Sequence, residues 1–450
     1  MVVLWTDALI FVLMTVICVL AIYLRNKEHI KRPLQKIAGS KVGVASLVVL
    51  LFFVLIGLMD SLHFKPTQEK SNEVMSCLDF WAKPLIEHVE KTYSAPFATT
   101  LYSKETVVLE DGTTQWSYPR LVYGGRHLEN PGSDLIPDIL KKLFYGLVQG
   151  VACGSLPILI YLAISYKRQK KWIKFDIIPA SMRTALFVTF IIVSLGYILI
   201  YLSSYYHVFG TDKVGEDVFY QAIKSIRTGL VLGTLTTLIM LPLAIVFGIL
   251  AGYFQGWLDD IIQYLYTTLN SIPGVLLIAA SILMVQVYIS NHEQSFTSII
   301  VRADMRLLFL CLILGLTNWT GLCRLLRAET LKLREMEYVQ ASQALGVKKS
   351  IILIRHILPN VMHIILISVV LDFSSLVLAE AVLSYINIGV DPTTYSWGNM
   401  INGARLELAR EPIVWWSLSA AFVFMFALVL AANLFADTVQ DAFDPRRNAE

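Results

Sequence analysis

Two acidic residues stand inside a strongly apolar stretch of the chain. Asp372 and Glu380 lie in the run VLDFSSLVLAEAVLSY, which has no other charged residue. An ionisable group inside a lipid bilayer is costly, and by default it indicates a pathway for ions, protons or polar substrates. These two carboxyl groups could therefore serve a secondary transporter or a channel.

Motifs for other chemistry are absent from the sequence. It contains no GxxxxGK[ST] phosphate loop, no HExxH metal helix and no recognisable nucleophile motif. Of the five cysteines, four lie in apolar runs and one in a polar segment, without a CxxC or Cys/His cluster (Cys18, Cys153, Cys311 and Cys323; Cys77). We therefore predict no catalytic residue, no metal site and no disulfide framework, and interpret the cysteines as small packing residues.

A second candidate site is the stretch EYVQASQALGVKKSIILIRHILPN, residues 337–360. Gly346 separates two short helical patterns and is placed to end the first in a left-handed cap. Lys348 and Lys349 would be solvated, and Pro359 would limit the second helix. Apolar residues recur at helical spacing on both sides of the glycine (Ala341, Ala344, Leu345; Ile351, Ile352, Ile354, Leu358). Such a stretch could dock in a groove of a soluble partner, or lie on lipid headgroups as an interfacial helix.

The surrounding chain has the composition of a multi-pass membrane protein. Of its 450 residues 56% are hydrophobic and 16% charged, and the mean hydropathy is +0.62. A net charge of +3 is too small to indicate a nucleic-acid partner. Nine stretches are candidate membrane spans: 4–24, 43–62, 144–166, 184–204, 227–252, 268–290, 307–323, 361–388 and 413–435.

Short basic segments predict the orientation of these spans. Segments 25–42, 167–183 and 324–355 are rich in Lys and Arg, which places them in the cytoplasm by the positive-inside rule. The N-terminus is then outside, as a retained span rather than a cleaved signal peptide, and the C-terminus is inside. The polar segment 63–143 would be exported. A hairpin signal at Asp111-Gly112 favours a small α+β domain there, acting as a passive cap or as a site for a partner.

The 337–360 stretch resembles the EAA loop of the permease subunits of ABC importers. That family has Glu-Ala-Ala, three residues, Gly, nine residues and Ile-x-Leu-Pro. Here Gln340, Ser342 and His356 replace three of these residues, while Ala341, Gly346, Leu358 and Pro359 keep the spacing. Four further segments are similar to the family in order along the chain: 207–230, 252–260, 378–405 and 441–446. The resemblance is to the second permease subunit of dipeptide, oligopeptide and nickel importers, and it covers about residues 184–446.

The resemblance implies a function and a set of partners. The chain would be the transport subunit of an ATP-driven importer in the bacterial inner membrane. It would form the path with a second permease, take substrate from an exported binding protein, and be driven by two separate ATPase subunits that bind ATP and Mg²⁺. Coupling to the ATPases would fall to Gln340, Ala341, Ser342, Ala344, Leu345, Gly346, Leu358 and Pro359. Peptides, nickel chelates and peptide-like antibiotics all remain possible substrates, and Glu380 could equally make a structural polar contact.

The expected organisation is a type I ABC permease core with an unusual N-terminal part. A first span and basic loop (1–42), a second span (43–62), the exported domain (63–143) and a third span with its loop (144–183) precede the core at 184–450, whose coupling loop is 335–360. Val218, Phe219, Ala222 and Ile226 are spaced for a helix lying along the outer membrane surface. We assign Asp217 and Arg227 to that exported interface helix, and we expect Arg227 to brace the fifth span rather than contact substrate.

Overall fold

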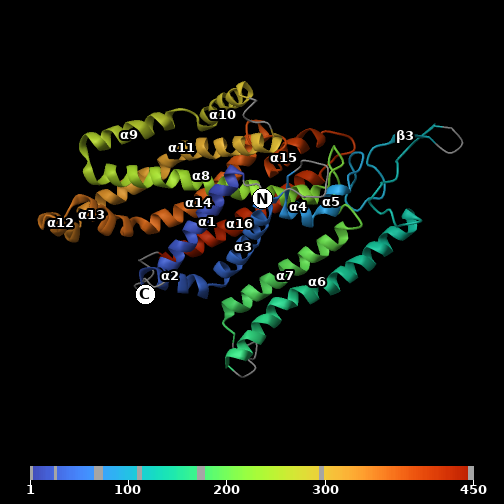
Figure 1. Ribbon diagram of the computed structural model, residues 1–450, viewed down its shortest axis with the longest axis horizontal. Helices are drawn as coiled ribbons and strands as arrows, with labels where there is room; N and C mark the ends of the chain where they lie inside the picture. The colour runs from blue at the N-terminus through green and yellow to red at the C-terminus, as the bar shows by residue number, and fades with distance from the viewer. Residues whose placement is uncertain are drawn as a thin grey trace. The chain divides into compact units, whose positions relative to one another are not determined.

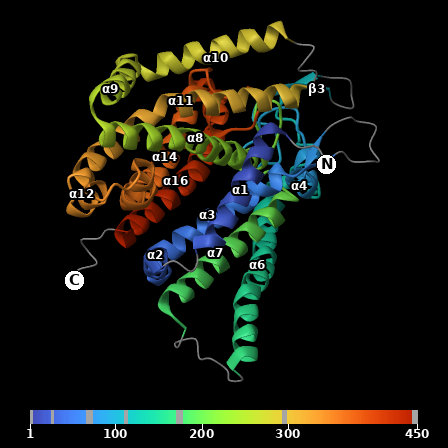
Figure 2. The same ribbon diagram turned by 60° about the vertical axis from the view of Figure 1, so that its left-hand side comes forward.

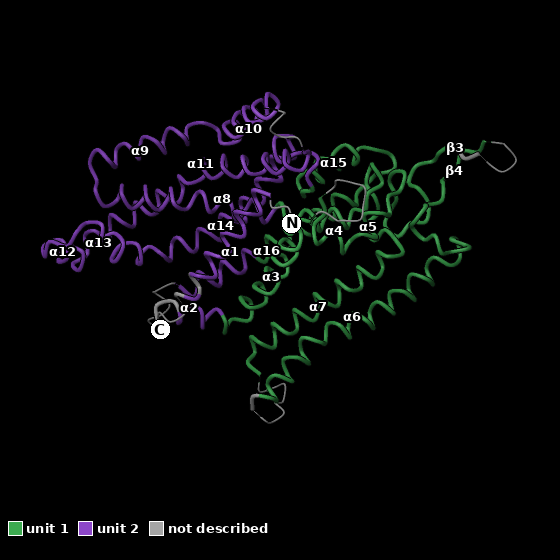
Figure 3. The backbone as a smooth tube through the Cα atoms, in the orientation of Figure 1, with its two compact units in different colours: residues 1–2, 38–228, 395–431 green, residues 3–37, 229–394, 432–450 purple. Residues whose placement is uncertain are grey.

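The computed structural model describes residues 4–24, 28–64, 74–108, 114–169, 178–292 and 298–443. They divide into two compact units (Figure 3). Unit 1 is built mainly from residues 38–228 and 395–431, and unit 2 mainly from 3–37, 229–394 and 432–450. The turn of the expected hairpin at Asp111-Gly112 lies outside the described residues.

Unit 1 contains a long helical hairpin and a mixed segment of short helices and strands (Figure 1). Its elements are α3 (Lys41–Ser61), β1 (His63–Phe64), β2 (Met75–Ser76), α4 (Cys77–Trp81), α5 (Lys83–Glu87), β3 (Glu105–Val108), β4 (Thr114–Ser117), α6 (Pro131–Gln169), α7 (Ala180–Ser203) and α15 (Trp397–Glu407). The helices α8 (Val218–Phe254) and α16 (Trp416–Phe443) contribute residues to both units.

The hairpin of α6 and α7 is held together by glycines spaced four residues apart. Gly146, Gly150 and Gly154 fall on one face of α6, because four residues are close to one helical turn. A Cβ atom at Gly150 would lie 2.7 Å from the carbonyl oxygen of Ser194 on α7. The Ser194 hydroxyl in turn donates a hydrogen bond to the Gly150 carbonyl over 3.0 Å. This close approach is the small-residue packing typical of membrane helices.

The segment between α3 and α6 mixes helix and strand, as predicted. β1 pairs antiparallel with β2, and β3 with β4. Ser76 caps α4 in a reciprocal capping box with Asp79. Asp79 also accepts hydrogen bonds from Tyr220 and Lys224 at the start of α8. Side chains from both parts form one apolar cluster with Ala82, Leu85, Phe219 and Tyr220 at its centre.

Unit 2 consists of helices alone in its described part. Its elements are α1 (Trp5–Leu24), α2 (Glu28–Gly39), α9 (Gly256–Ser271), α10 (Gly274–Asn291), α11 (Ile299–Arg334), α12 (Glu337–Ala344), α13 (Lys349–Ile352), the π-helical turn η3 (Leu353–Ile357) and α14 (Leu358–Tyr385). Figure 1 shows α12 and α13 together at one end of this unit, beyond α11, and Figure 2 shows α12 at the same end.

Close packing and polar contacts join the helices of unit 2. Cβ atoms at Gly248 and Gly252 of α8 would lie 2.7–2.8 Å from backbone oxygens of α11, so these two helices touch through their backbones. At the opposite end of α11, Asp304 accepts hydrogen bonds from the backbone and the hydroxyl of Thr6. The N-terminal helix α1 is thereby fastened to α11.

The helical membrane architecture predicted from the sequence is confirmed. Seven described helical runs are long and apolar enough to cross a membrane: α3, α6, α7, α8, α10, residues 349–385 and α16. The predicted spans 4–24 and 307–323 are also helical, in α1 and α11, but are not among these seven. The span predicted at 268–290 begins later, at Gly274, because Ile272 and Pro273 are not helical and separate α9 from α10.

Candidate functional site

The stretch from Glu337 to Asn360, called the knob below, forms two helical segments around Gly346. Gly346 has φ +74°, the left-handed conformation predicted for it. Its N–H donates to the carbonyl of Gln343 over 3.0 Å, and that of Val347 to Ser342 over 3.1 Å. These two bonds are those of a Schellman cap, which satisfies the last carbonyls of α12. The turn is therefore fixed by backbone geometry.

Some apolar residues of the knob are buried against unit 2, and others are exposed. Val339, Ile352 and Ile357 are fully buried and join the largest apolar cluster of unit 2. Leu345 is 83% exposed, more than any other large apolar side chain of the described residues, and Ile354 is 68% exposed. Gln340, Ala341, Ala344, Ile351 and Pro359 are exposed as well, whereas Ser342 and Leu358 are half-buried. Ile352 thus holds the knob in place, and the exposed residues form its free surface.

Polar contacts attach the knob to the end of α8. Gln343 of the knob donates to the hydroxyl of Tyr253 over 3.3 Å, and Arg334, the last residue of α11 before the knob, donates to the Tyr253 carbonyl over 3.1 Å. The ammonium group of Lys349, predicted to be only a solvated head, lies 5.4 Å from the centre of the Phe254 ring. Sequence reasoning missed this role of Tyr253 and Phe254, although both fall in the 252–260 segment singled out for its resemblance.

Asp259 on α9 and Arg327 on α11 form a bidentate ion pair near the same end. The guanidinium Nε and Nη2 atoms each donate to one carboxylate oxygen over 2.6 Å. Bidentate pairs fix orientation as well as distance. The pair therefore holds α9 against the helix that leads into the knob.

The two acidic residues of α14 have different surroundings. Glu380 is 2% exposed and accepts a hydrogen bond from the hydroxyl of Ser384 over 2.7 Å. Asp372 is half-buried. The two lie eight residues apart, about 12 Å along the helix axis, so the structure does not join them into one site.

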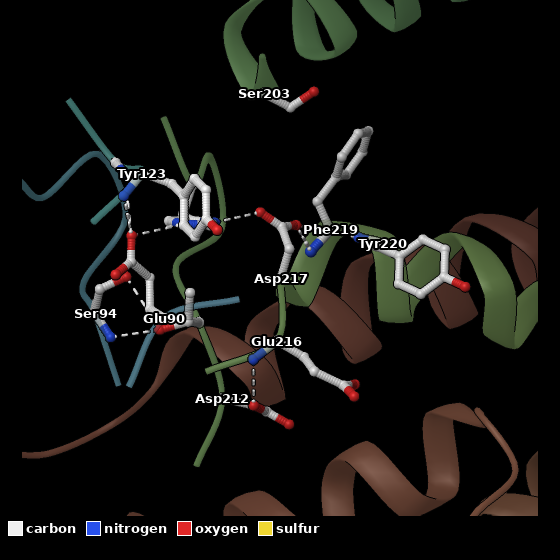
Figure 4. Close-up of polar contacts among 12 residues, drawn as sticks. Glu90, Ser94, Tyr123, Ser203, Asp212, Glu216, Asp217, Phe219 and Tyr220 are labelled. Atoms are coloured by element: carbon white, nitrogen blue, oxygen red, sulfur yellow. Dashed lines mark hydrogen bonds and ion pairs between the residues drawn. The ribbon is translucent and has the colours of Figure 1, made fainter. Parts of the chain in front are cut away.

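A buried polar network in unit 1 ties segment 207–217 to the segment between α3 and α6 (Figure 4). The carboxylate of Glu90 accepts hydrogen bonds from the backbone N–H groups of Val122, Tyr123 and Gly124 over 2.8, 2.8 and 3.1 Å. The imidazole Nε2 of His207 lies 3.6 Å from Glu90 Oε1. Glu90 thus gathers both segments around one charge.

Asp217 completes this network and begins α8. Its Oδ1 accepts from the backbone N–H groups of Phe219 and Tyr220 over 2.9 and 3.2 Å, as an N-cap residue does (Figure 4). Its Oδ2 lies 2.7 Å from His207 Nδ1. Asp217 therefore serves as cap and as counter-ion at once.

The network shifts the pKa values of two of its members. Burial by itself would lower the pKa of His207, but the hydrogen bond to Asp217 and the nearby Glu90 carboxylate outweigh burial and raise it to about 9. Burial by itself would raise the pKa of Glu90, but His207 and the three backbone N–H groups lower it to about 2. Charged forms of both groups are thus favoured in the folded protein.

Thr211 provides a further connection within unit 1. Its hydroxyl accepts from the Ser94 backbone N–H over 2.7 Å and donates to the Thr92 carbonyl over 2.9 Å. Its carbonyl accepts from the indole N–H of Trp416 over 2.8 Å. Segment 207–217 is therefore clamped between parts of the chain on either side of it in sequence.

One expectation about this region is wrong. Val218, Phe219, Ala222 and Ile226 do not form a separate helix along the membrane surface; they are the buried first turns of α8, which runs unbroken to Phe254. Nothing after the cap at Asp217 interrupts the helix until Gln255, whose φ is +54°. Arg227 is half-buried within this helix, and its bracing role stays a prediction.

Comparison with known proteins gives the class of this helical membrane protein. Residues 244–449 match the model of binding-protein-dependent transport system inner membrane components. The chain is 33% identical over 245 residues to a putative peptide permease of Brucella suis, covering 54% of this chain and 74% of that one. It is 30% identical over 240 residues to the oligopeptide transport permease of Bacillus subtilis, covering 53% and 72%.

The match to a third relative covers a smaller share of that relative's length. The dipeptide transport permease of Lactococcus lactis is 31% identical over 244 residues, 54% of this chain and 65% of that protein. With the identity and coverage of the Brucella relative, the chain belongs to the family of binding-protein-dependent transport system inner membrane components. It is a multi-pass permease.

Proposed function

We propose that the chain is the permease subunit of an ATP-driven importer for dipeptides or oligopeptides. It would form the translocation path with a second permease, receive substrate from an exported binding protein, and use two separate ATPase subunits, binding no nucleotide itself. The observation that carries this proposal is the knob, whose capped turn presents large exposed apolar side chains at the position of the family's coupling motif. The similarity to the dipeptide permease of Lactococcus and the oligopeptide permease of Bacillus supports the substrate class.

The knob suits docking better than it suits a lipid surface. Its free face exposes Leu345 and Ile354, and α12 itself carries no basic residue. The basic residues of the knob all follow the turn at Gly346 (Lys348, Lys349 and Arg355). An apolar helix face of this kind fits a hydrophobic groove on a partner helix bundle. Burying Leu345 alone would contribute about 1.5–3 kcal/mol to binding. Coupling would then involve Gln340, Ala341, Ser342, Ala344, Leu345 and Gly346, with Leu358 and Pro359 starting α14.

Force applied to the knob would reach the membrane helices through contacts described above. Val339, Ile352 and Ile357 transmit it to the apolar cluster of unit 2, and Tyr253 transmits it to α8. Because α8 and α11 touch through their backbones, they would move as one body. Alternating access then follows as rigid-body rocking of this unit.

The proposal includes an orientation. The knob and the basic segments 25–42 and 167–183 would be cytoplasmic, and segment 63–143 would be exported with the N-terminus. A cysteine probe at the exposed Gln115 should react with a membrane-impermeant thiol reagent in intact cells, and Lys348→Cys should not. Reaction at position 348 but not 115 would reverse the orientation.

The deciding experiment tests the knob as a docking site. Leu345→Asp, in a chain purified with its neighbouring subunits, should reduce ATPase recovered per permease at least tenfold, because a buried apolar contact becomes an unpaired charge. Lys348→Ala, an exposed neighbour in the same turn, is the matched control and should recover as wild type. Equal recovery for both variants would make the knob an interfacial helix.

A second measurement addresses the rival reading of a secondary transporter that uses Asp372 and Glu380. Peptide uptake should stop when the phosphate-loop lysine of the co-purified ATPase is replaced. Uptake that survives this change would favour the secondary transporter.

A further inference from the structure

The spanning part of α14 carries two carboxylates, those of Asp372 and Glu380, and that of Asp372 accepts no hydrogen bond from the described residues. It lies 14 residues after Leu358, so it is about 21 Å along the helix and near its middle. Among the described residues none supplies a cation or a hydrogen-bond donor to its carboxylate. Glu380, by contrast, has the Ser384 hydroxyl.

The face of α14 that carries Asp372 is not the face suited to lipid. Ser368, Asp372, Ser375 and Ala379 fall within an arc of about 60° when successive residues are turned by 100°. All four are partly or fully accessible in this chain. A strip of large exposed apolar side chains, Leu371, Leu378 and Val382, adjoins it, and the centres of the two strips are about 70° apart around the helix. The helix thus presents a small, polar strip beside an apolar one.

A charged carboxylate at this depth needs water or a counter-ion. The strip of large apolar residues already provides a surface for lipid, so the polar strip is available to line an aqueous path. A carboxylate there attracts cations and repels anions. In a transport path the counter-ion of this carboxylate must come and go, so a cationic group of the substrate itself can serve.

We infer that the Ser368–Ala379 strip lines the translocation path and that Asp372 binds a cationic group of the substrate, such as the protonated terminal ammonium of a peptide. The choice of a peptide as substrate rests on the proposed function. The preference of the site for a cationic group rests on Asp372 and does not depend on that function. Asp372 would be a specificity-determining residue, and one carboxylate would hold the substrate weakly enough to release it.

Thiol reactivity tests the site without any peptide. Ser375→Cys and Leu378→Cys are made in a chain without native cysteines, in permeabilised membrane vesicles that expose both membrane faces. Each is treated with a cationic (trimethylammonium) and an anionic (sulfonate) ethyl methanethiosulfonate. Ser375→Cys should react with both, on the order of tenfold faster with the cation, because Asp372 lies one turn away. Leu378→Cys should react with neither.

The charge is then removed in the same background. Asp372→Asn should abolish the preference for the cationic reagent, and Asp372→Glu should keep it. The inference is overturned if Ser375→Cys is as unreactive as Leu378→Cys, or if the preference persists without the carboxylate. It is also overturned if Asp372→Asn reduces co-purification of the second permease, because the carboxylate would then pair with that subunit.

Uptake separates this inference from the proposed function. Uptake of radiolabelled trialanine by cells with the complete importer should fall at least tenfold in Asp372→Asn and less than threefold in Asp372→Glu. Undiminished uptake in Asp372→Asn contradicts a role in substrate binding. If wild-type cells take up no trialanine, the peptide function is wrong, and the thiol measurement alone decides whether a cation site exists.

Discussion

Replacing Gly346 by valine should weaken ATPase docking without disturbing any membrane span. A Cβ atom built at Gly346 would meet nothing within 4 Å, so the substitution causes no clash. Its whole effect comes from the backbone, because φ is +74° and side chains with a Cβ disfavour the left-handed region. The strain amounts to about 1–3 kcal/mol for a non-glycine residue held there.

The chain can keep the strain or relieve it. Relief opens the Schellman cap, with the loss of the Gly346–Gln343 and Val347–Ser342 hydrogen bonds, at about 1 kcal/mol each. If the undocked knob relieves the strain, docking must restore the strained turn, at a cost of about 1–3 kcal/mol. At 1.4 kcal/mol per tenfold, the affinity for the ATPase should then fall about 5- to 150-fold. Strain kept in both the undocked and the docked state would lower the stability of the chain and leave the affinity unchanged.

The assay is titration of the purified ATPase onto the detergent-solubilised permease. Gly346→Asn is the matched control, because asparagine adopts the left-handed conformation more readily than other side chains, and it should bind nearly as wild type. Gly346→Ala should fall between the two. The reasoning fails if Gly346→Val binds as tightly as Gly346→Asn, since both add a Cβ into the same open space.

Three further predictions follow from other parts of the molecule. The raised pKa of His207 contributes stability that is complete below pH 6.5 and is lost as the pH rises through about 9. The lowered pKa of Glu90 contributes stability that is complete above pH 4.5 and is lost as the pH falls through about 2. Thermal melting of the full chain should therefore peak between about pH 4.5 and 6.5, and His207→Gln should flatten the alkaline limb; an unchanged limb would contradict this assignment. Gly150→Leu should destabilise the purified chain by about 1–3 kcal/mol through overpacking against α7, whereas Gly196→Leu, with nothing within 4 Å of its added Cβ, should be tolerated; equal melting temperatures would refute the close approach. Ala341→Asp should reduce ATPase recovery while Lys348→Ala does not, and equal recovery would remove Ala341 from the docking face.

Local signals in the sequence predicted much of the fold and of the knob. A glycine between two short helical patterns was sufficient to place the left-handed turn at Gly346, because no other residue type adopts it without penalty. Length and hydropathy located the long helices, since a span must satisfy its backbone internally. The extent of α8 was misjudged because an amphipathic first turn looks the same in a surface helix and in the buried start of a span.

The networks could not be predicted because their members are distant in sequence. Ser94 and Thr211 are 117 residues apart, and Thr6 and Asp304 are 298 apart. Glu90 carries no local sign of its role, since its partners are backbone N–H groups supplied by a loop more than 30 residues later. The π-helical turn Leu353–Ile357 also has no recognisable sequence signal.

The length of α11 has a mechanical consequence. With 36 residues the helix measures about 54 Å, so a tilt of about 10° about its middle displaces its two ends by about 5 Å each, in opposite directions. The knob follows one end directly, and Asp304 holds Thr6 near the other. A shift the size of a single side chain at the ATPase would thus be delivered to α1 as well. In the proposed importer, α1 would therefore move with α11, and the drag of α1 in the lipid would enter the turnover rate.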